Sequence, residues 1–525
     1  MKRIAAPTVG GMISTAVLSL VVLPAIYLIW RGYQLRRAPR RRSGLPRTDM
    51  NKERTMHMRR ADDRQEPALQ SWRRWTATAS TALAAAALSA GVTAGAQEAG
   101  PAAVEPTAAR RILESIADPA LQALAQEVLE RNPTVAAAEA RALAARQVAP
   151  QVKALPDPMI GGMAFVAPPE TRVGPQRWSA TLSQRIPWFG KLGLREQAAL
   201  EQAAAQDAQV EAQRLDLVTE TRRLYYEIAF LDAYADVVRA DRETLGHYEE
   251  LARARYASGV GLQQAVIKVQ AEITKDDNRL LDVRNRRATL AAAMNALRDR
   301  PQDTQIPRLT LPRFAAVPLE PAAIWTRALD LRPEMAAADR EIAQAEAMVD
   351  LARKEYKPDL SLSAIYTQVG ARTDPAGVMA PPPDNGSDVF GVSLSFNLPI
   401  KRRKLAAGVE EAAQRRVAAS ERKRAVVTSI DRSLGELLER TSATWDQLRL
   451  LEDVLGIQAD QSLRSAESGY SAGSLNSLDL LDAERVLLEV RTTTERARAD
   501  YAVAIARLEG AVGEPVAPAA GGTGR

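Results

Sequence analysis

Few residues in this sequence could do chemistry. The chain has no Cys and only two His, His57 and His247, so it lacks thiolate ligands, disulfides and redox pairs. None of the motifs HExxH, CxxC, GxxxxGK[ST] or GxSxG occurs. Asp479 and Asp482, spaced i, i+3, share one face of a predicted helix and concentrate negative charge there. The sequence therefore predicts no enzyme, no cofactor and no protein-bound metal.

Long helices must carry these carboxylates. Residues 191–255 contain no Pro and would span about 100 Å as one helix. Apolar residues recur every seven positions, which is typical of a coiled-coil seam. The series are Leu217, Leu224, Leu231, Val238 and Leu245 before a turn, Val266, Ile273 and Leu280 after it, and Val269, Val283 and Leu290 as a second stripe.

Residues 177–186 and 389–398 alternate apolar and polar side chains, which predicts β-strands. Each half of the chain has two strands, and four strands cannot close a sheet. A bilayer excludes unpaired strand edges, so we expect several subunits to build one transmembrane barrel. A sandwich on a protein core would need more strands. The side chains expected to face lipid are Trp178, Leu182, Ile186, Phe390, Val392, Leu394 and Phe396.

The sequence repeats once at a spacing of about 200 residues. Residues 128–140 resemble 328–340, and the turn at 254–262 resembles that at 468–475. Each half is predicted to read helix, strand, loop, strand, very long helix, turn, helix. We expect repeats at 97–318 and 319–513 and a disordered tail at 514–525.

The N-terminal region contains two unrelated signals. Residues 8–30 are apolar and long enough to span a bilayer, and residues 1–45 resemble the C-terminal tail of a heavy-metal pump of the resistance-nodulation-division (RND) superfamily. Residues 73–96 read as a secretory signal peptide within a 50–96 signal region. Either residues 1–49 come from a misplaced start or gene fusion, or the protein is membrane-tethered. In the first case the start is one of Met50, Met56 and Met58.

The net charge of +6 does not indicate a nucleic-acid partner. Residues 1–74 hold 16 Lys and Arg against 5 Asp and Glu, so the rest of the chain is net negative. Binding to phosphates needs clustered cations on the folded surface. We therefore expect no nucleic-acid binding.

The region from about 119 to 513 resembles the TolC-type outer membrane factors, in particular their heavy-metal efflux branch. The likeness is carried by IPWFGKLGLR at 186–195, by the paired YASG and YSAG turns, and by YSAGSLNSLDLLDAE at 470–484. It implies a mainly α fold with membrane β: a homotrimer in which four strands per chain form a 12-stranded barrel, continued by an α-helical coiled-coil barrel through the periplasm. It also implies an outer membrane location in a Gram-negative bacterium, with an inner-membrane RND pump and a periplasmic adaptor as partners.

The resemblance also implies roles for particular residues. Asp479 and Asp482 match two aspartates that ring the periplasmic entrance in similar proteins, and Leu475 replaces a basic residue that latches the gate in some of them. In similar proteins the helical turns meet the adaptor. The corresponding residues here are Tyr256, Gly259, Gly261, Leu262, Tyr470, Gly473 and Leu475.

These observations predict a passive channel subunit of a tripartite efflux system, with heavy-metal cations as the expected substrate. Export of organic compounds is one alternative, and a periplasmic coiled-coil adaptor is another. An inner-membrane transporter fragment would need a second long apolar run after the signal peptide, and none follows.

Overall fold

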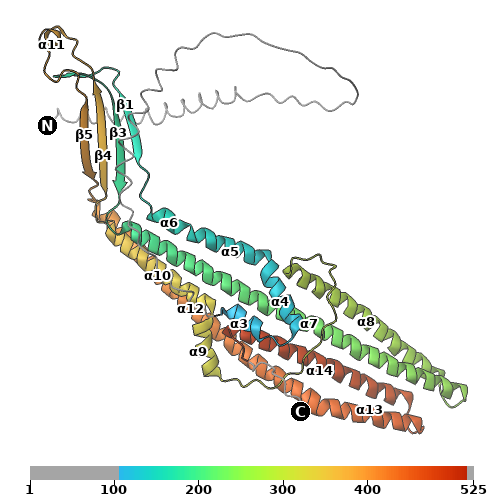
Figure 1. Cartoon of the computed structure of the whole chain (residues 1–525). Coiled ribbons are helices and arrows are strands. Elements are labelled where there is room, and N and C mark those ends of the chain that lie inside the picture. The colour runs from blue at the N-terminus through green and yellow to red at the C-terminus, as the bar shows by residue number, and fades with distance from the viewer. Residues whose placement is uncertain (1–105, 517–525) are drawn as a thin grey trace, which may run out of the picture. The chain divides into compact units, whose positions relative to one another are not determined.

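The computed structural model describes residues 106–516. The segments predicted at 1–49 and 50–96, and most of the tail predicted at 514–525, lie outside these residues. The described part is mainly helical, with one small antiparallel sheet beyond one end of the long helices (Figure 1).

The first half of the described chain ends in a helical hairpin. Its elements are α3 (Ala108–Ser115), α4 (Pro119–Arg131), α5 (Pro133–Arg146), α6 (Val148–Lys153), β1 (Met159–Ala164), β2 (Glu170–Thr171), β3 (Gly174–Ile186), α7 (Lys191–Ala257) and α8 (Gln263–Leu297). Asp118 and Asn132 cap α4 and α5, because each side chain accepts a hydrogen bond from the N–H two residues on. Both helices begin with Pro, whose missing N–H costs no hydrogen bond there.

The second half repeats this order, as predicted. Its elements are α9 (Pro321–Leu331), α10 (Pro333–Lys354), β4 (Leu360–Val369), α11 (Pro375–Met379), β5 (Val389–Phe396), α12 (Arg402–Leu450), a π-helical turn (Leu451–Leu455), α13 (Gly456–Ser471) and α14 (Ser477–Val512). The π-helical turn separates α12 from α13, whereas α7 runs unbroken for 67 residues. The short elements α3, α6, β2 and α11 were not predicted.

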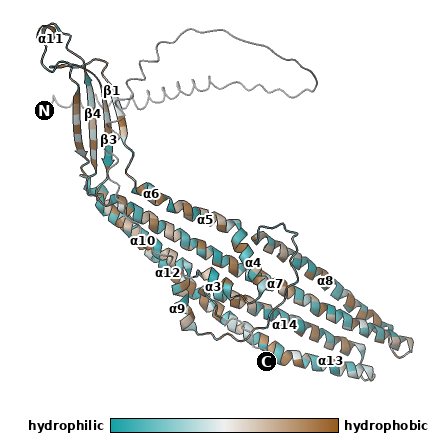
Figure 2. Cartoon of the chain, viewed as in Figure 1, coloured by the Kyte–Doolittle hydropathy of each residue, from teal (hydrophilic) through white to brown (hydrophobic). Residues whose placement is uncertain are grey.

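The long helices pack along the predicted seams. α7 lies along α8, α10 and α14. Leu224, Leu231, Val238 and Leu245 of α7 are buried, as are Val269 and Val283 of α8, while Leu217 is half-buried. Figure 2 shows apolar and polar residues interspersed along these helices, as expected for amphipathic helices. Among the described residues, no helix is both long enough and apolar enough to cross a membrane.

The sheet has the strand order β1-β3-β4-β5, and β2 pairs with β3. The four longer strands confirm the prediction of two per half. The register between β4 and β5 places similar residues opposite each other: Leu362 lies opposite Leu394, and Ser363 lies opposite Ser393. One face is therefore apolar and the other is rich in Ser and Thr, as the alternation predicted.

The apolar face of the sheet is open. Phe390 is 83% exposed, and Ile186 is half-buried. The other residues predicted to face lipid are also exposed: Trp178, Leu182, Val392, Leu394 and Phe396. Trp178, Tyr366 and Phe390 form an aromatic row across three strands, with successive ring centroids 5.2 and 5.1 Å apart.

Both outer edges of the sheet are also open. Among residues 106–516, β1 pairs only with β3, and β5 pairs only with β4. A row of unpaired N–H and C=O groups is a template for pairing with another chain.

Candidate functional site

The two helical hairpins, α7–α8 and α13–α14, end in turns of the same geometry. Gly259 and Gly473, each three residues after a Tyr, have left-handed backbone angles, with φ of +77° and +81°. Gly adopts this conformation without strain. In each turn one carbonyl, of Arg255 or of Gly469, accepts hydrogen bonds from the N–H groups five and six residues on. The sequence likeness between the two turns is therefore matched by their backbones.

Arg255 joins the two turns. Its guanidinium carbon lies 4.7 Å from the centroid of the Tyr470 ring, and the group donates a hydrogen bond to the Tyr470 carbonyl oxygen. Tyr470 is only 5% exposed, whereas Tyr256, its counterpart in the other turn, is 50% exposed. In the single chain the Arg255 side chain lies over the Tyr470 ring, and the contact of Tyr470 with an adaptor stays a prediction.

The contact between Arg255 and Tyr470 lies in the turn where the latch residue was predicted to be missing. Leu475 has no charge at the position where the resemblance implies a basic residue. Arg255 supplies a cation to that turn from the other hairpin.

Apolar side chains are exposed at the ends of both hairpins. Leu262 is 73% exposed, and Leu475, at 37%, packs near Gly469. Val260 and Leu478 are exposed as well, although the sequence analysis did not select them. We call Tyr256, Val260, Leu262, Leu475 and Leu478 the turn surface.

Asp479 and Asp482 lie in the first two turns of α14, and both are exposed in the single chain. Asp479 also belongs to a capping box: its carboxylate accepts from the Asn476 N–H at 3.4 Å, and the Asn476 side chain accepts from the Asp479 N–H at 3.2 Å. Asp479 therefore helps to start the helix, a role that the sequence analysis did not assign.

Polar contacts tie the two hairpins together along their length. Each one joins an acid to a base or a donor to an acceptor. From the middle of α7 toward the turns they are Glu227 with Arg496, Glu272 with Arg485, Tyr248 with Glu467, and Arg255 with Tyr470. We call these four the hairpin contacts.

Three carboxyl groups that the sequence analysis missed are buried among these contacts. Asp241 of α7, Asp276 of α8 and Glu484 of α14 are 5%, 0% and 4% exposed. One signal could have identified Asp276: it stands seven residues after Val269 and seven before Val283, where the seam calls for an apolar side chain.

The environment of this cluster raises carboxyl pKa values. Burial raises the pKa of Asp241 to about 7, assisted by the neighbouring Glu484 carboxyl. Burial likewise raises the pKa of Asp276 to about 7, assisted by Asp241, while Arg279 acts in the opposite direction. These two groups hold protons at pH values where ordinary carboxyls are ionised.

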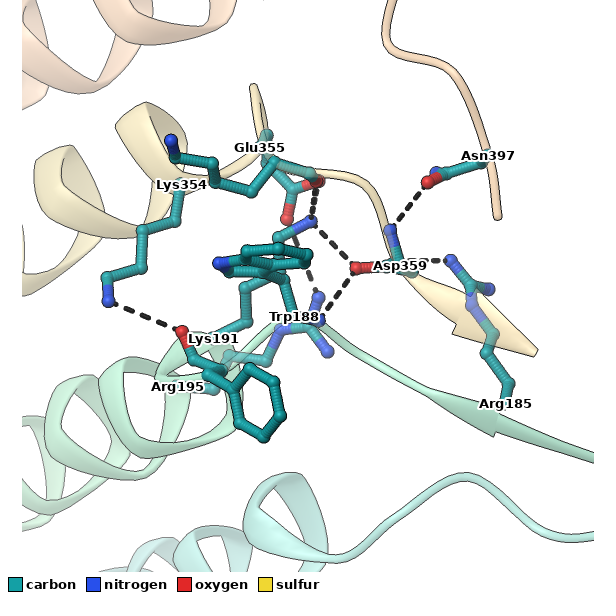
Figure 3. Close-up of polar contacts among 10 residues, drawn as sticks. Arg185, Trp188, Lys191, Arg195, Lys354, Glu355, Asp359 and Asn397 are labelled. Carbon is teal, nitrogen blue, oxygen red and sulfur yellow. Dashed lines mark hydrogen bonds and ion pairs between the residues drawn. The ribbon is translucent and has the colours of Figure 1, made fainter. Parts of the chain in front are cut away.

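A second buried polar cluster lies where β3 and β4 meet the helices (Figure 3). Lys191, the first residue of α7, is 1% exposed. Its ammonium group donates to the Asp359 carboxylate at 2.9 Å, to the Lys357 carbonyl at 3.0 Å and to Glu355 at 3.3 Å. All three donors of this buried ammonium are thus engaged.

Asp359 precedes β4 and collects the other contacts of this cluster. Its carboxylate also accepts from Arg185 at 2.9 Å and from the Trp188 N–H at 3.1 Å. Burial alone would raise the pKa of Asp359, but these donors and Lys191 lower it to about 2. The junction between the sheet and the helices therefore rests on one ionised, fully hydrogen-bonded carboxylate.

Gly190 explains part of the IPWFGKL stretch. It precedes α7 with φ of +83°, and a β-carbon there would lie 2.5 Å from the Lys354 amino group. The left-handed backbone angle is what favours Gly here, because the Lys354 amino group ends a flexible side chain that can move aside. The Gly-Lys pair turns the chain from β3 into α7 and places Lys191 inside.

Comparisons with known proteins agree with this architecture. A family model described as outer membrane efflux protein matches residues 124–298 and 325–514. The chain is 24% identical to the outer membrane protein TolC of Vibrio cholerae over 64% of this chain and 75% of that protein. It is 23% identical to the cobalt-zinc-cadmium resistance protein CzcC of Cupriavidus metallidurans over 65% of this chain and 77% of that protein.

A solved structure of CusC shares the fold. The TM-score is 0.64, with 18% identity over 76% of this chain and 93% of that one. CusC has been described in terms of the conformational changes that accompany its folding and transmembrane channel formation.

Proposed function

Because the chain belongs to the outer membrane efflux protein family, we propose that it is the outer membrane channel subunit of a tripartite efflux system that exports heavy-metal cations. Members of this family are efflux channels of the Gram-negative outer membrane and not enzymes, and this chain is one of them. The partners are an inner-membrane RND pump and a periplasmic adaptor that docks on the turn surface. The family match over both halves of the chain carries the channel part of this proposal.

The proposed channel is a homotrimer. The two open edges of the sheet support it, because β1 of one subunit can pair with β5 of the next. Three chains then contribute twelve strands to one closed barrel, with the apolar face toward lipid and the Ser- and Thr-rich face toward the lumen.

The entrance of the channel lies at the hairpin ends, where three copies of Asp479 and Asp482 gather six carboxylates around the axis. The exposure of both side chains supports this placement. Such a ring attracts cations by concentrating negative potential in a narrow passage.

Replacing both aspartates with Asn tests the entrance. The amide keeps the shape and can still accept the Asn476 N–H, so α14 starts normally, but six charges are lost from the trimer. We expect a clear fall in cation selectivity, measured as the single-channel reversal potential in a salt gradient. The Ala pair should give the same fall and, in addition, lose the hydrogen bond from the Asn476 N–H to Asp479. An unchanged reversal potential in the Asn pair would place these carboxylates away from the passage.

The substrate class rests on the likeness to a cobalt-zinc-cadmium resistance protein. We expect deletion of the gene to lower tolerance to at least one of copper, silver, zinc, cobalt and cadmium, and the wild-type gene on a plasmid to restore it. Growth of the same deletion strain in the presence of dyes and antibiotics is the matched comparison. Sensitivity to organic compounds alone would make the protein an exporter of organic molecules.

A further inference from the structure

The buried carboxyls Asp241, Asp276 and Glu484 come from three helices in two hairpins. Asp241 and Asp276 belong to α7 and α8, and Glu484 belongs to α14. The Asp241 carboxyl interacts with those of both Glu484 and Asp276. All four hairpin contacts join complementary groups, whereas Asp241 with Glu484 joins acid to acid across the same interface.

Each of these carboxyls has one oxygen without a partner. One oxygen of each, Oδ1 of Asp241, Oδ2 of Asp276 and Oε2 of Glu484, is buried without a hydrogen-bond partner. Apolar side chains of the same interface surround the hairpin contacts, among them Leu245, Val269, Leu480 and Leu487. Buried carboxylates in such surroundings repel one another strongly.

Most of the charged and titratable groups near the three carboxyls form ion pairs or hydrogen bonds with one another. Arg279 pairs with Asp276 at 2.6 Å and acts on both Asp276 and Asp241. Glu272 holds both Lys275 and Arg485, and the Tyr248 hydroxyl donates to Glu467. Across the described residues, no group of three or more acidic, His or Cys side chains is arranged to hold a metal ion. Protonation relieves the repulsion that remains.

We propose that Asp241 and Asp276, with Glu484 beside Asp241, form a proton-controlled lock that holds the α7–α8 hairpin against the α13–α14 hairpin and weakens when Asp241 and Asp276 ionise. Protonated, Asp241 and Asp276 donate hydrogen bonds to neighbouring carboxyls and pack between the helices. Ionised, they carry more negative charge than Arg279 can balance, and the interface between the hairpins loses stability.

The direction of the pH dependence follows from the raised pKa values of Asp241 and Asp276. A carboxyl whose pKa is higher in the packed state than its usual value of about 4 stabilises packing fully below pH 4. It loses that contribution as the pH rises through about 7. The lock is therefore strong in acid and weak above neutral pH.

The proposal rests on the proposed function in one respect only, that the hairpin ends form the entrance.

The lock can be tested by measuring the distance between the two turns. The chain has no Cys, so Ser258→Cys and Ser474→Cys provide unique sites for spin labels in the two turns. Electron–electron resonance on the full-length trimer in detergent at pH 5 and pH 8 then reports the separation of the turns.

We expect short distances at pH 5 and, at pH 8, a ratio of long to short distances that is higher by up to about a hundredfold for each titrating group, since each pH unit between pH 5 and the pKa of about 7 contributes a factor of ten. Glu484→Gln and Asp241→Asn keep the shape and each remove one charge, so each should reduce the change in distance between pH 5 and pH 8. Glu489→Gln, at an exposed position on the same helix, should behave like the wild type.

The lock is overturned if the wild-type distances do not change with pH, or if Glu484→Gln and Asp241→Asn, both shown to be trimeric, change as the wild type does. Conductance of the same samples separates the two proposals. Distances that respond to pH and to Glu484→Gln while conductance stays constant support the lock and overturn the position of the entrance.

Discussion

Replacing Lys191 with Met should lower the free energy of unfolding by about 3–5 kcal/mol, because it leaves the buried Asp359 carboxylate without its principal counterion. Asp359 would still accept hydrogen bonds from Arg185 and from the Trp188 N–H, but the buried positive charge beside it would be gone. The measurement is loss of helical circular dichroism of the detergent-solubilised protein against guanidinium concentration.

Lys153 provides the matched control. Its side chain is 64% exposed and pairs with Glu196 at 2.9 Å, so Lys153→Met should cost no more than about 1 kcal/mol. If both Met variants cost the same, the junction does not depend on the buried ion pair. The depressed pKa of Asp359 adds a pH signature. The contribution of the carboxylate is complete above pH 4 and is lost as the pH falls toward 2, so the difference between wild type and Lys191→Met should shrink in acid.

Arg at Leu394 should cost about 2–4 kcal/mol of folding free energy in a bilayer, if that side chain faces lipid near the midplane. Leu394 is 63% exposed and lies opposite Leu362 on the apolar face of the sheet. The cost can be measured by equilibrium unfolding from phospholipid vesicles.

Ser393→Arg is the paired variant, one residue away on the opposite face. Ser393 lies opposite Ser363 on the polar face, which is proposed to border a water-filled lumen where a charged side chain stays hydrated. This variant should insert normally and change the single-channel conductance. Equal tolerance of Arg at the two positions would contradict the assignment of the faces, whatever the number of subunits in the barrel.

Local patterns made the elements predictable. Strand alternation in 177–186 and 389–398 reflects a side-chain period of two, and the heptads of α7 and α8 reflect close packing of helices. Both patterns are read within one segment, and the structure has the corresponding strands and helices. The Gly positions of the turns were predictable for the same reason, because a left-handed residue is required where antiparallel helices reverse.

Long-range contacts were not predictable in this way. Lys191 lies 168 residues from Asp359, and nothing in IPWFGKL shows that its Lys turns inward. The Arg255 contact with Tyr470 spans 215 residues, and no local pattern indicates it.

The sequence by itself determined the kinds of elements, their duplicated order, the two faces of the sheet and the family, because each of these depends on residue types at short, fixed spacings. Only the tertiary structure decided that Asp241, Asp276 and Glu484 meet in one buried cluster, and that Tyr470 is covered while Tyr256 is exposed. Which side chains meet across helices depends on the neighbours of each helix and on the axial register between them. No periodicity within a single helix encodes that register.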